Sequence, residues 1–169
     1  MSGSGRINYI GYAMIFFISA ISLKIYLESD TFNLKCIISN KDGKTYCVRE
    51  RANMEASADL LAHATDNMST LVKYVGEKYP DRENVQRLVN GYKPDVIKET
   101  LPTSKFTAYS ENKGEKLAFC LNKKKGGSEL IDVNTLTFVA IHELSHIMTA
   151  SIGHKKELWL NFKFLLQNA

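Results

Sequence analysis

The feature that most constrains this chain is the pentapeptide His-Glu-Leu-Ser-His at residues 142–146, followed by a third histidine, His154. In an α-helix, positions i and i+4 lie on one face about one turn apart. The rings of His142 and His146 can therefore reach a single tetrahedral Zn²⁺. Glu143 lies beside them, in the HExxH pattern of zinc hydrolases, where the glutamate acts on a water molecule. The pattern predicts a helix that carries a zinc site.

The flanking residues predict where this helix begins and ends. Asn134 is a candidate N-cap. Apolar residues then recur at helical spacing: Leu136, Ala140, Ile141, Leu144, Ile147 and Met148. Gly153 is expected to end the helix in a left-handed conformation. His154 would follow this turn, where the chain can curl back toward the metal.

A catalytic zinc site has three protein ligands and one open position. His154 is the predicted third ligand, because an imidazole just after a glycine turn suits zinc. Glu157, at the start of the last predicted helix, is the alternative, although a glutamate there is also favoured by the helix dipole alone.

The length of 169 residues indicates one domain of ordinary size, and the net charge is +4. Two of the positive charges, Arg6 and Lys24, lie within residues 1–27, which hold no acidic residue, so residues 28–169 carry only +2. A charge this small gives no argument for nucleic-acid binding. The sequence leaves the oligomeric state open.

The N-terminal segment predicts a membrane anchor. Ile7 to Leu23 carries no charge, and a helix over residues 7–27 would span about 31 Å, which matches the hydrocarbon core of a bilayer. A cleaved signal peptide and a buried helix are the alternatives. The flanking charges leave the orientation undetermined. We therefore divide the chain into a tail (1–6), a single-pass transmembrane anchor (7–27) and a folded domain (28–169), which places the protein at a membrane.

The three cysteines match no zinc-finger spacing. Cys36 and Cys47 flank a strong turn signal at Ser39–Lys44, which predicts a hairpin with strands at residues 32–38 and 44–48. The two cysteines fall opposite each other within one residue of register. A cross-strand disulfide can form there if the domain faces an oxidising compartment. The simpler interpretation is two small, unlinked residues in a hairpin.

The remaining pattern predicts an α+β fold. Helices are expected at 53–78, at 81–91 with Asp81 as its cap, and at 94–101. Strands are expected at 106–111 and 117–122, with a short one at 130–131. A final helix covers 157–166, and its apolar side chains Trp159, Phe162 and Leu166 are expected to pack in the core against the metal-ligand helix.

The strands come directly before the predicted metal-ligand helix. A peptide substrate can dock as an added strand on an open sheet edge. The 117–122 strand is the candidate for that edge.

Residues 142–146, Gly153-His154 and Glu157-Leu158-Trp159 together resemble the WLM (Wss1-like) and SprT-like zinc metallopeptidases, especially the small predicted peptidases of large nucleocytoplasmic DNA viruses. The clear resemblance covers roughly residues 105–169. It implies a minimal zincin-like domain with a small antiparallel or mixed sheet, helices and an HExxH active helix. It also implies that His142, His146 and His154 bind one Zn²⁺ and that Glu143 is the general base. Many family members place the third histidine six residues after the second, whereas here the interval is eight.

The resulting hypothesis is a membrane-anchored metallopeptidase that cleaves a protein or peptide substrate. A zinc-activated water attacks the peptide carbonyl, and Glu143 transfers its proton to the leaving amine. Tyr109 is a candidate donor to the developing oxyanion. Two alternatives stay open: a membrane-tethered metal-binding protein without activity, whose zinc is structural, and a DNA-associated protease of the Wss1/SprT type.

Overall fold

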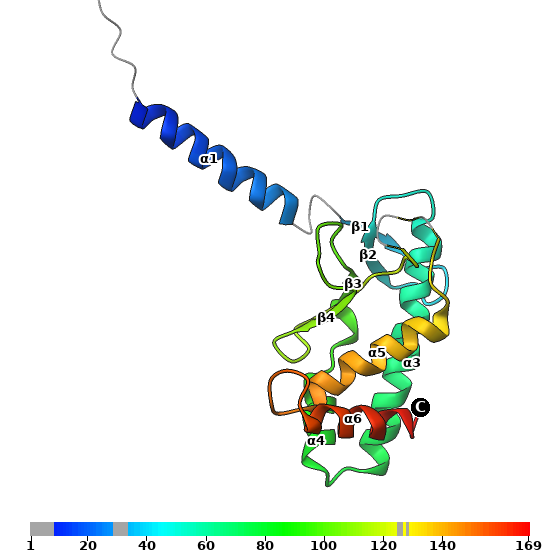
Figure 1. Ribbon diagram of the computed structural model, residues 1–169. Helices are drawn as coiled ribbons and strands as arrows, with labels where there is room; N and C mark the ends of the chain where they lie inside the picture. Colours follow the sequence, from blue (N-terminus) through cyan, green and yellow to red (C-terminus); the bar gives the residue numbers. More distant parts are fainter. Residues whose placement is uncertain (1–8, 29–33, 125–126, 128) are drawn as a thin grey trace, which may run out of the picture.

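The computed structural model describes residues 9–28, 34–124, 127 and 129–169. The predicted tail, residues 1–6, and the first two residues of the predicted anchor lie outside the described residues. Over these described residues the fold is α+β, as predicted, with five α-helices and one small mixed sheet (Figure 1). The elements are α1 (Tyr9–Glu28), β1 (Leu34–Ile38), β2 (Thr45–Arg49), α3 (Met54–Lys78), α4 (Glu83–Gly91), a 3-10 turn (Pro94–Val96), β3 (Ile97–Glu99), β4 (Ala108–Glu111), β5 (Lys116–Phe119), α5 (Val133–Met148) and α6 (Lys156–Leu166).

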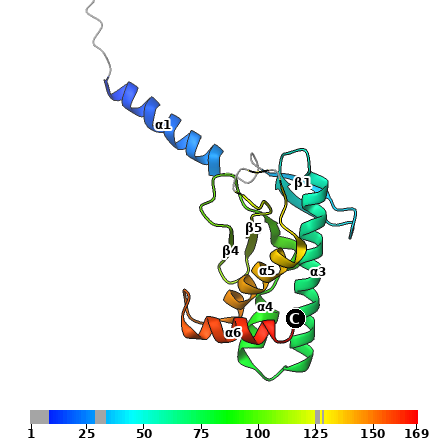
Figure 2. The same ribbon diagram turned by 45° about the vertical axis from the view of Figure 1, so that its right-hand side comes forward.

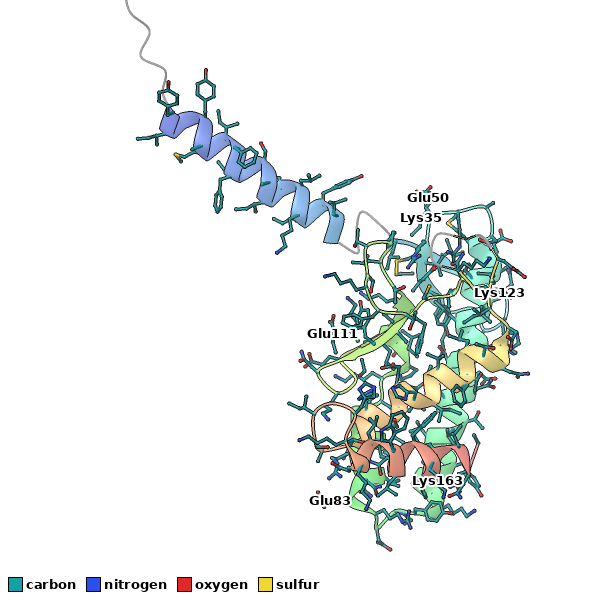
Figure 3. All side chains as sticks on the ribbon, in the orientation of Figure 1. Lys35, Glu50, Glu83, Glu111, Lys123 and Lys163 are labelled. Carbon is teal, nitrogen blue, oxygen red and sulfur yellow. A yellow bond between two sulfur atoms is a disulfide. The ribbon has the colours of Figure 1, made fainter. Side chains whose placement is uncertain are left out.

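Helix α1 extends away from the rest of the chain in both ribbon views (Figures 1 and 2). Its span Tyr9–Leu27 has a mean hydropathy of 1.8, and none of it is buried against the other elements. Figure 3 shows its side chains projecting from all sides of the helix. By length and composition the helix is able to cross a membrane. A signal sequence meets the same criterion, and the anchor therefore stays a prediction.

The predicted hairpin is confirmed as β1 and β2, which pair antiparallel with Cys36 directly opposite Cys47. The two residues form a disulfide. The simpler interpretation, two unlinked cysteines, is therefore wrong, because the register brings the two side chains face to face. Lys35 and Glu50 form an ion pair at the end of the same hairpin (Figure 3).

The sheet has the strand order β1-β2-β3-β5-β4, with parallel pairing of β3 to both of its neighbours. The predicted helix at 94–101 is wrong: only Pro94–Val96 turns, and the next three residues form the central strand β3. The reason is tertiary pairing, which overrides local helical propensity in so short a segment. Ile97 and Glu99 are buried on either side of Lys98.

The candidate edge strand is also reassigned. Strand β5, which overlaps the predicted 117–122 strand, lies between β3 and β4, and its own partner β4 forms the open edge on that side of the sheet. The predicted short strand at 130–131 is reduced to a single bridge between Asn122 and Leu130.

The core lies between the sheet and helices α3, α4 and α5. Helix α3 confirms the long helix predicted from the apolar spacing, and it buries Leu61, Met68, Leu71 and Val75. Helix α4 confirms the second helix, but Asp81 is not its cap: the N-cap position is Arg82 and makes no side-chain capping bond. The last helix, α6, buries Leu158, Phe162 and Leu165.

Two details of α5 differ from the prediction. The N-cap is Asp132, whose carboxylate accepts the backbone N–H of Thr135 at 2.9 Å, and Asn134 lies in the first turn. The helix ends at Met148. Gly153 adopts the expected left-handed conformation, with φ of 82°, but it lies in the loop after the helix.

Candidate metal centre and active-site cleft

Three histidines from two elements meet at one point. His142 and His146 lie one turn apart on α5, and His154 comes from the loop between α5 and α6. Nε2 of His142 lies 3.2 Å from Nε2 of His146 and 3.3 Å from Nε2 of His154. One ligand atom from each ring lies within 4.8 Å of the others. The chain therefore brings together the three predicted ligands.

This donor set fits a single zinc ion. Tetrahedral zinc with Zn–N bonds of 2.0–2.1 Å separates neighbouring nitrogens by about 3.3 Å. Hydrogen bonds among the rings do not account for this arrangement. Nε2 of His142 faces two other ring nitrogens, but a nitrogen of a neutral imidazole either donates one hydrogen bond or accepts one. In the described part of the chain no other His, Cys, Asp or Glu joins this group. A set of three protein ligands is typical of catalytic zinc sites, and four is typical of structural ones.

The surroundings of the cluster favour neutral imidazoles. Burial lowers the pKa of His142, and it lowers the pKa of His146 to about 4. The positive charges of the neighbouring histidines and of Lys113 lower the pKa of His146 further. Neutral imidazole is the form that binds metal.

Glu143 lies on the same helix with its carboxylate withdrawn from solvent, and the residue is only 5% exposed. Burial raises the pKa of this carboxyl to about 7, and the backbone N–H of Ser110, which donates to it, opposes the increase. Strand β4 therefore contacts the candidate general base directly.

The imidazoles and Glu143 open into a cleft of about 600 Å³ between β4, α5 and α6. Its apolar lining consists of Phe106, Ala108, Phe138, Val139, Trp159 and Phe162. A larger cavity, of about 1000 Å³, lies between α1 and residues 101–111 and includes none of the histidines. The three histidines and Glu143 therefore belong to the smaller, aromatic cleft.

The open edge of β4 faces this cleft. The N–H of Cys120 bonds the carbonyl of Thr107, so Thr107 points its backbone groups toward β5. Hydrogen-bonded pairs alternate along an antiparallel ladder. The backbone groups of Ala108 and Ser110 must therefore point outward, and the bond from Ser110 to Glu143 agrees with this direction.

Two expectations for α6 change. Trp159 is 51% exposed and Leu166 is 39% exposed, so only Phe162 of the predicted trio is a core residue. Trp159 instead lies at the cleft, with its ring centroid 6.0 Å from those of His142 and His154. Its distance from the core follows from its position on the face of α6 that turns toward the histidines.

Glu157, the alternative third ligand, is directed elsewhere. Its carboxylate accepts the backbone N–H groups of Ala150 at 2.9 Å and Ser151 at 3.1 Å. Tyr109 lines the cleft, and its role as an oxyanion donor stays a prediction.

The sequence did not reveal two residues near the centre, Ser110 and Lys113. Ser110 acts through its backbone N–H, which leaves no trace in residue type. Lys113 belongs to the Asn-Lys-Gly turn after β4, and its ammonium contacts the carbonyls at the end of α5. The turn itself was predictable, but its position over α5 depends on the sheet order.

No model of a known protein family matches the sequence. The chain is 28% identical over 159 residues to the uncharacterized protein R325 of Acanthamoeba polyphaga mimivirus, a match that covers 92% of this chain and 76% of that protein. It is 32% identical over 62 residues to the uncharacterized protein 136R of Invertebrate iridescent virus 6, which covers 37% of this chain and 35% of that protein.

Two crystal structures of Wss1 are also similar to the chain. Wss1 from Saccharomyces cerevisiae has a TM-score of 0.48 and 16% identity, covering 69% of this chain and 79% of that one. A point mutant of Wss1 from S. pombe has a TM-score of 0.38 and 21% identity, covering 55% and 80%. In sequence, the chain thus resembles proteins of two viruses.

Proposed function

We propose that this protein is a zinc metallopeptidase with a zincin-like domain over residues 28–169, tethered to a membrane by α1. The observation that carries the proposal is the convergence of His142, His146 and His154: the Nε2 atom of His142 lies 3.2 and 3.3 Å from those of the other two, close to the spacing around one tetrahedral zinc ion. A ligand set of three imidazoles favours a catalytic site over a structural one.

Each part of the cleft supports one step of peptide hydrolysis. The outward N–H and C=O groups of Ala108 offer a substrate main chain the bonds of an added strand. The aromatic lining, with Phe138 and Trp159 at its surface, suits an apolar side chain next to the scissile bond. A substrate held in this way places one peptide carbonyl above the histidines.

A zinc ion bound by the three imidazoles would polarise that carbonyl and lower the pKa of a water molecule. Glu143 accepts the proton of the water as its oxygen forms a bond to the carbonyl carbon. Glu143 then delivers this proton to the amide nitrogen as the C–N bond breaks. The N–H of Ser110 favours the ionised form of the Glu143 carboxyl, which is the form that accepts this proton.

The proposal is tested by metal analysis of the full chain in detergent, paired with a chelator-sensitive cleavage assay on an unfolded protein substrate. The parent should hold one zinc ion per chain. His142→Ala should lose it, whereas Glu143→Gln should keep it and lose at least about 100-fold in cleavage rate.

Cleavage by Glu143→Gln at the parent rate would refute the mechanism. A parent that binds zinc tightly and cleaves no protein would identify it instead as a membrane-tethered metal-binding protein without activity.

A further inference from the structure

The third histidine is carried by the loop of residues 149–155, which we name the His154 loop. The loop begins after the last residue of α5, Met148, and ends before the first residue of α6, Lys156. His142 and His146 are fixed by a helix, but His154 follows an exposed stretch in which Ile152 is 84% exposed and Gly153 is left-handed. The position of His154 therefore depends on how the loop is held at its start.

Lys113 binds backbone carbonyl groups at the start of the His154 loop. Its Nζ contacts the carbonyl oxygen of Thr149, lies 3.1 Å from that of Ser151 and lies 3.4 Å from that of His146. These carbonyls lie in or just after the last turn of α5, where carbonyls have no partner within the helix and favour a cation.

Glu157 binds backbone N–H groups of the same segment. Its carboxylate accepts the N–H groups of Ala150 and Ser151 at 2.9 and 3.1 Å. Arg87 of α4 supports this arrangement: its Nη2 lies 3.7 Å from the Glu157 carboxylate, and its Nε donates to the carbonyl of Met148 at 3.2 Å. A cation and an anion from two different elements thus bind opposite sides of the same peptide units.

The turn that carries Lys113 is held in place by close packing. Lys113 lies in a left-handed turn with φ of 58°, next to Gly114. A Cβ atom on Gly114 would lie only 2.2 Å from the carbonyl oxygen of Gly91, the last residue of α4. The turn after β4 therefore packs directly on the end of α4, which fixes the direction from which Lys113 reaches the His154 loop.

We infer that Lys113 and Glu157 are positioning residues that preorganise the His154 loop and so set the affinity of the three-histidine centre for its metal. This inference rests on the proposed function, since it requires that the histidines bind a metal. Neither residue belongs to the three-histidine group or lines the cleft. Partners that orient metal ligands typically change affinity by about 10- to 100-fold, which is the loss expected for Lys113→Met or Glu157→Gln.

The experiment titrates Zn²⁺, and Co²⁺ as a visible probe, into the metal-free full chain in detergent. Lys73→Met and Glu77→Gln are the matched controls, because both residues are exposed on α3, which lies outside the loop contacts. These controls should bind within about two-fold of the parent. Lys113→Arg keeps the cation and should recover most of the affinity. The Co²⁺ absorption of Lys113→Met should show a weakened third imidazole, a change that a loss of fold stability alone does not produce.

His154→Ala defines the largest loss of metal affinity expected for the Lys113 and Glu157 variants. If Lys113→Met and Glu157→Gln bind as tightly as the parent while His154→Ala does not, the inference is wrong and the proposed metal centre stands. If their affinity falls only at temperatures where the metal-free variant unfolds, the two residues are structural and the inference is equally wrong. If His142→Ala and His154→Ala both bind like the parent, the proposed function itself fails.

Discussion

At the scale of single residues, Glu157 has a charge that the backbone of the His154 loop stabilises. The N–H groups of Ala150 and Ser151 and the guanidinium of Arg87 lower the pKa of this carboxyl to about 2. The folded protein therefore prefers the ionised form more than the unfolded chain does. Stability from this preference is fully present above the unfolded pKa of 4.5 and is lost as the pH falls toward 2.

The difference in unfolding midpoint between the metal-free parent and Glu157→Gln should therefore be largest near neutral pH and should shrink by about pH 3. Urea unfolding at several pH values measures it. A difference that stayed constant down to acid pH would show that the charge of Glu157 contributes nothing.

We expect Phe138 to set the preference for the substrate side chain in the proposed cleft. The residue is 54% exposed, and its ring packs edge-on against Phe162 at 5.3 Å. Phe138→Ala should reduce the ratio of kcat/KM for a peptide with leucine at the cleavage site over one with alanine by about ten-fold. Metal affinity should not change. An unaltered ratio would place the substrate side chain elsewhere.

At the scale of elements, the open edge of β4 is the proposed docking strand, in place of the predicted 117–122 strand. Ala108→Pro removes the N–H that faces the cleft, and proline is tolerated on an edge strand where the N–H bonds no neighbouring strand. Loss of one main-chain hydrogen bond should lower kcat/KM by about 3- to 10-fold and leave zinc binding intact. Ala108→Ser, which keeps the N–H, is the control. Parent-like cleavage by Ala108→Pro would argue against strand addition.

The same strands show what sequence patterns predict and what they leave open. The long helix α3, the hairpin at Cys36 and Cys47, and the helix that bears His142 and His146 were all predicted, because each depends on contacts between residues close in the chain. Strand β3 was mistaken for a helix, since its conformation depends on β2 and β5, which lie far away in sequence.

The candidate site divides in the same way. HExxH spacing predicts how two rings align on one helix turn, and the glycine turn before His154 indicated a return toward them. The roles of Lys113 and the Ser110 N–H depend on which strand forms the edge. That order follows from tertiary packing, and no local pattern encodes it.

At the scale of the whole molecule, the disulfide links the hairpin that follows α1. Cys36 and Cys47 are separated by 11 residues, and closing a loop of this length stabilises a fold by about 3 kcal/mol in the chain-entropy estimate. Cys36→Ser combined with Cys47→Ser should lose about that much stability in urea unfolding. Reductant should destabilise the parent and leave the double variant unchanged. Equal stability of the two proteins would show that the bond is not formed.

The predicted anchor is tested without shortening the chain. Ile15→Lys combined with Ile18→Lys places two charges near the middle of α1, each costing about 3 kcal/mol at a bilayer centre. The parent should remain with liposomes after an alkaline wash, and the double variant should be released. Release of the parent, or retention of the variant, would exclude a transmembrane α1.

The strand order also has a consequence for how the chain is made. Strand β2 finds its inner neighbour, β3, only after α3 and α4 have been synthesised, and β3 in turn waits for β5. A ribosome therefore releases the β1–β2 hairpin long before the centre of the sheet exists, with the inner side of β2 unpaired and open to aggregation. Non-local parallel pairing of this kind folds slowly. Once formed, the cross-link between Cys36 and Cys47 holds the two strands of this hairpin in register, whether or not their later partners are in place.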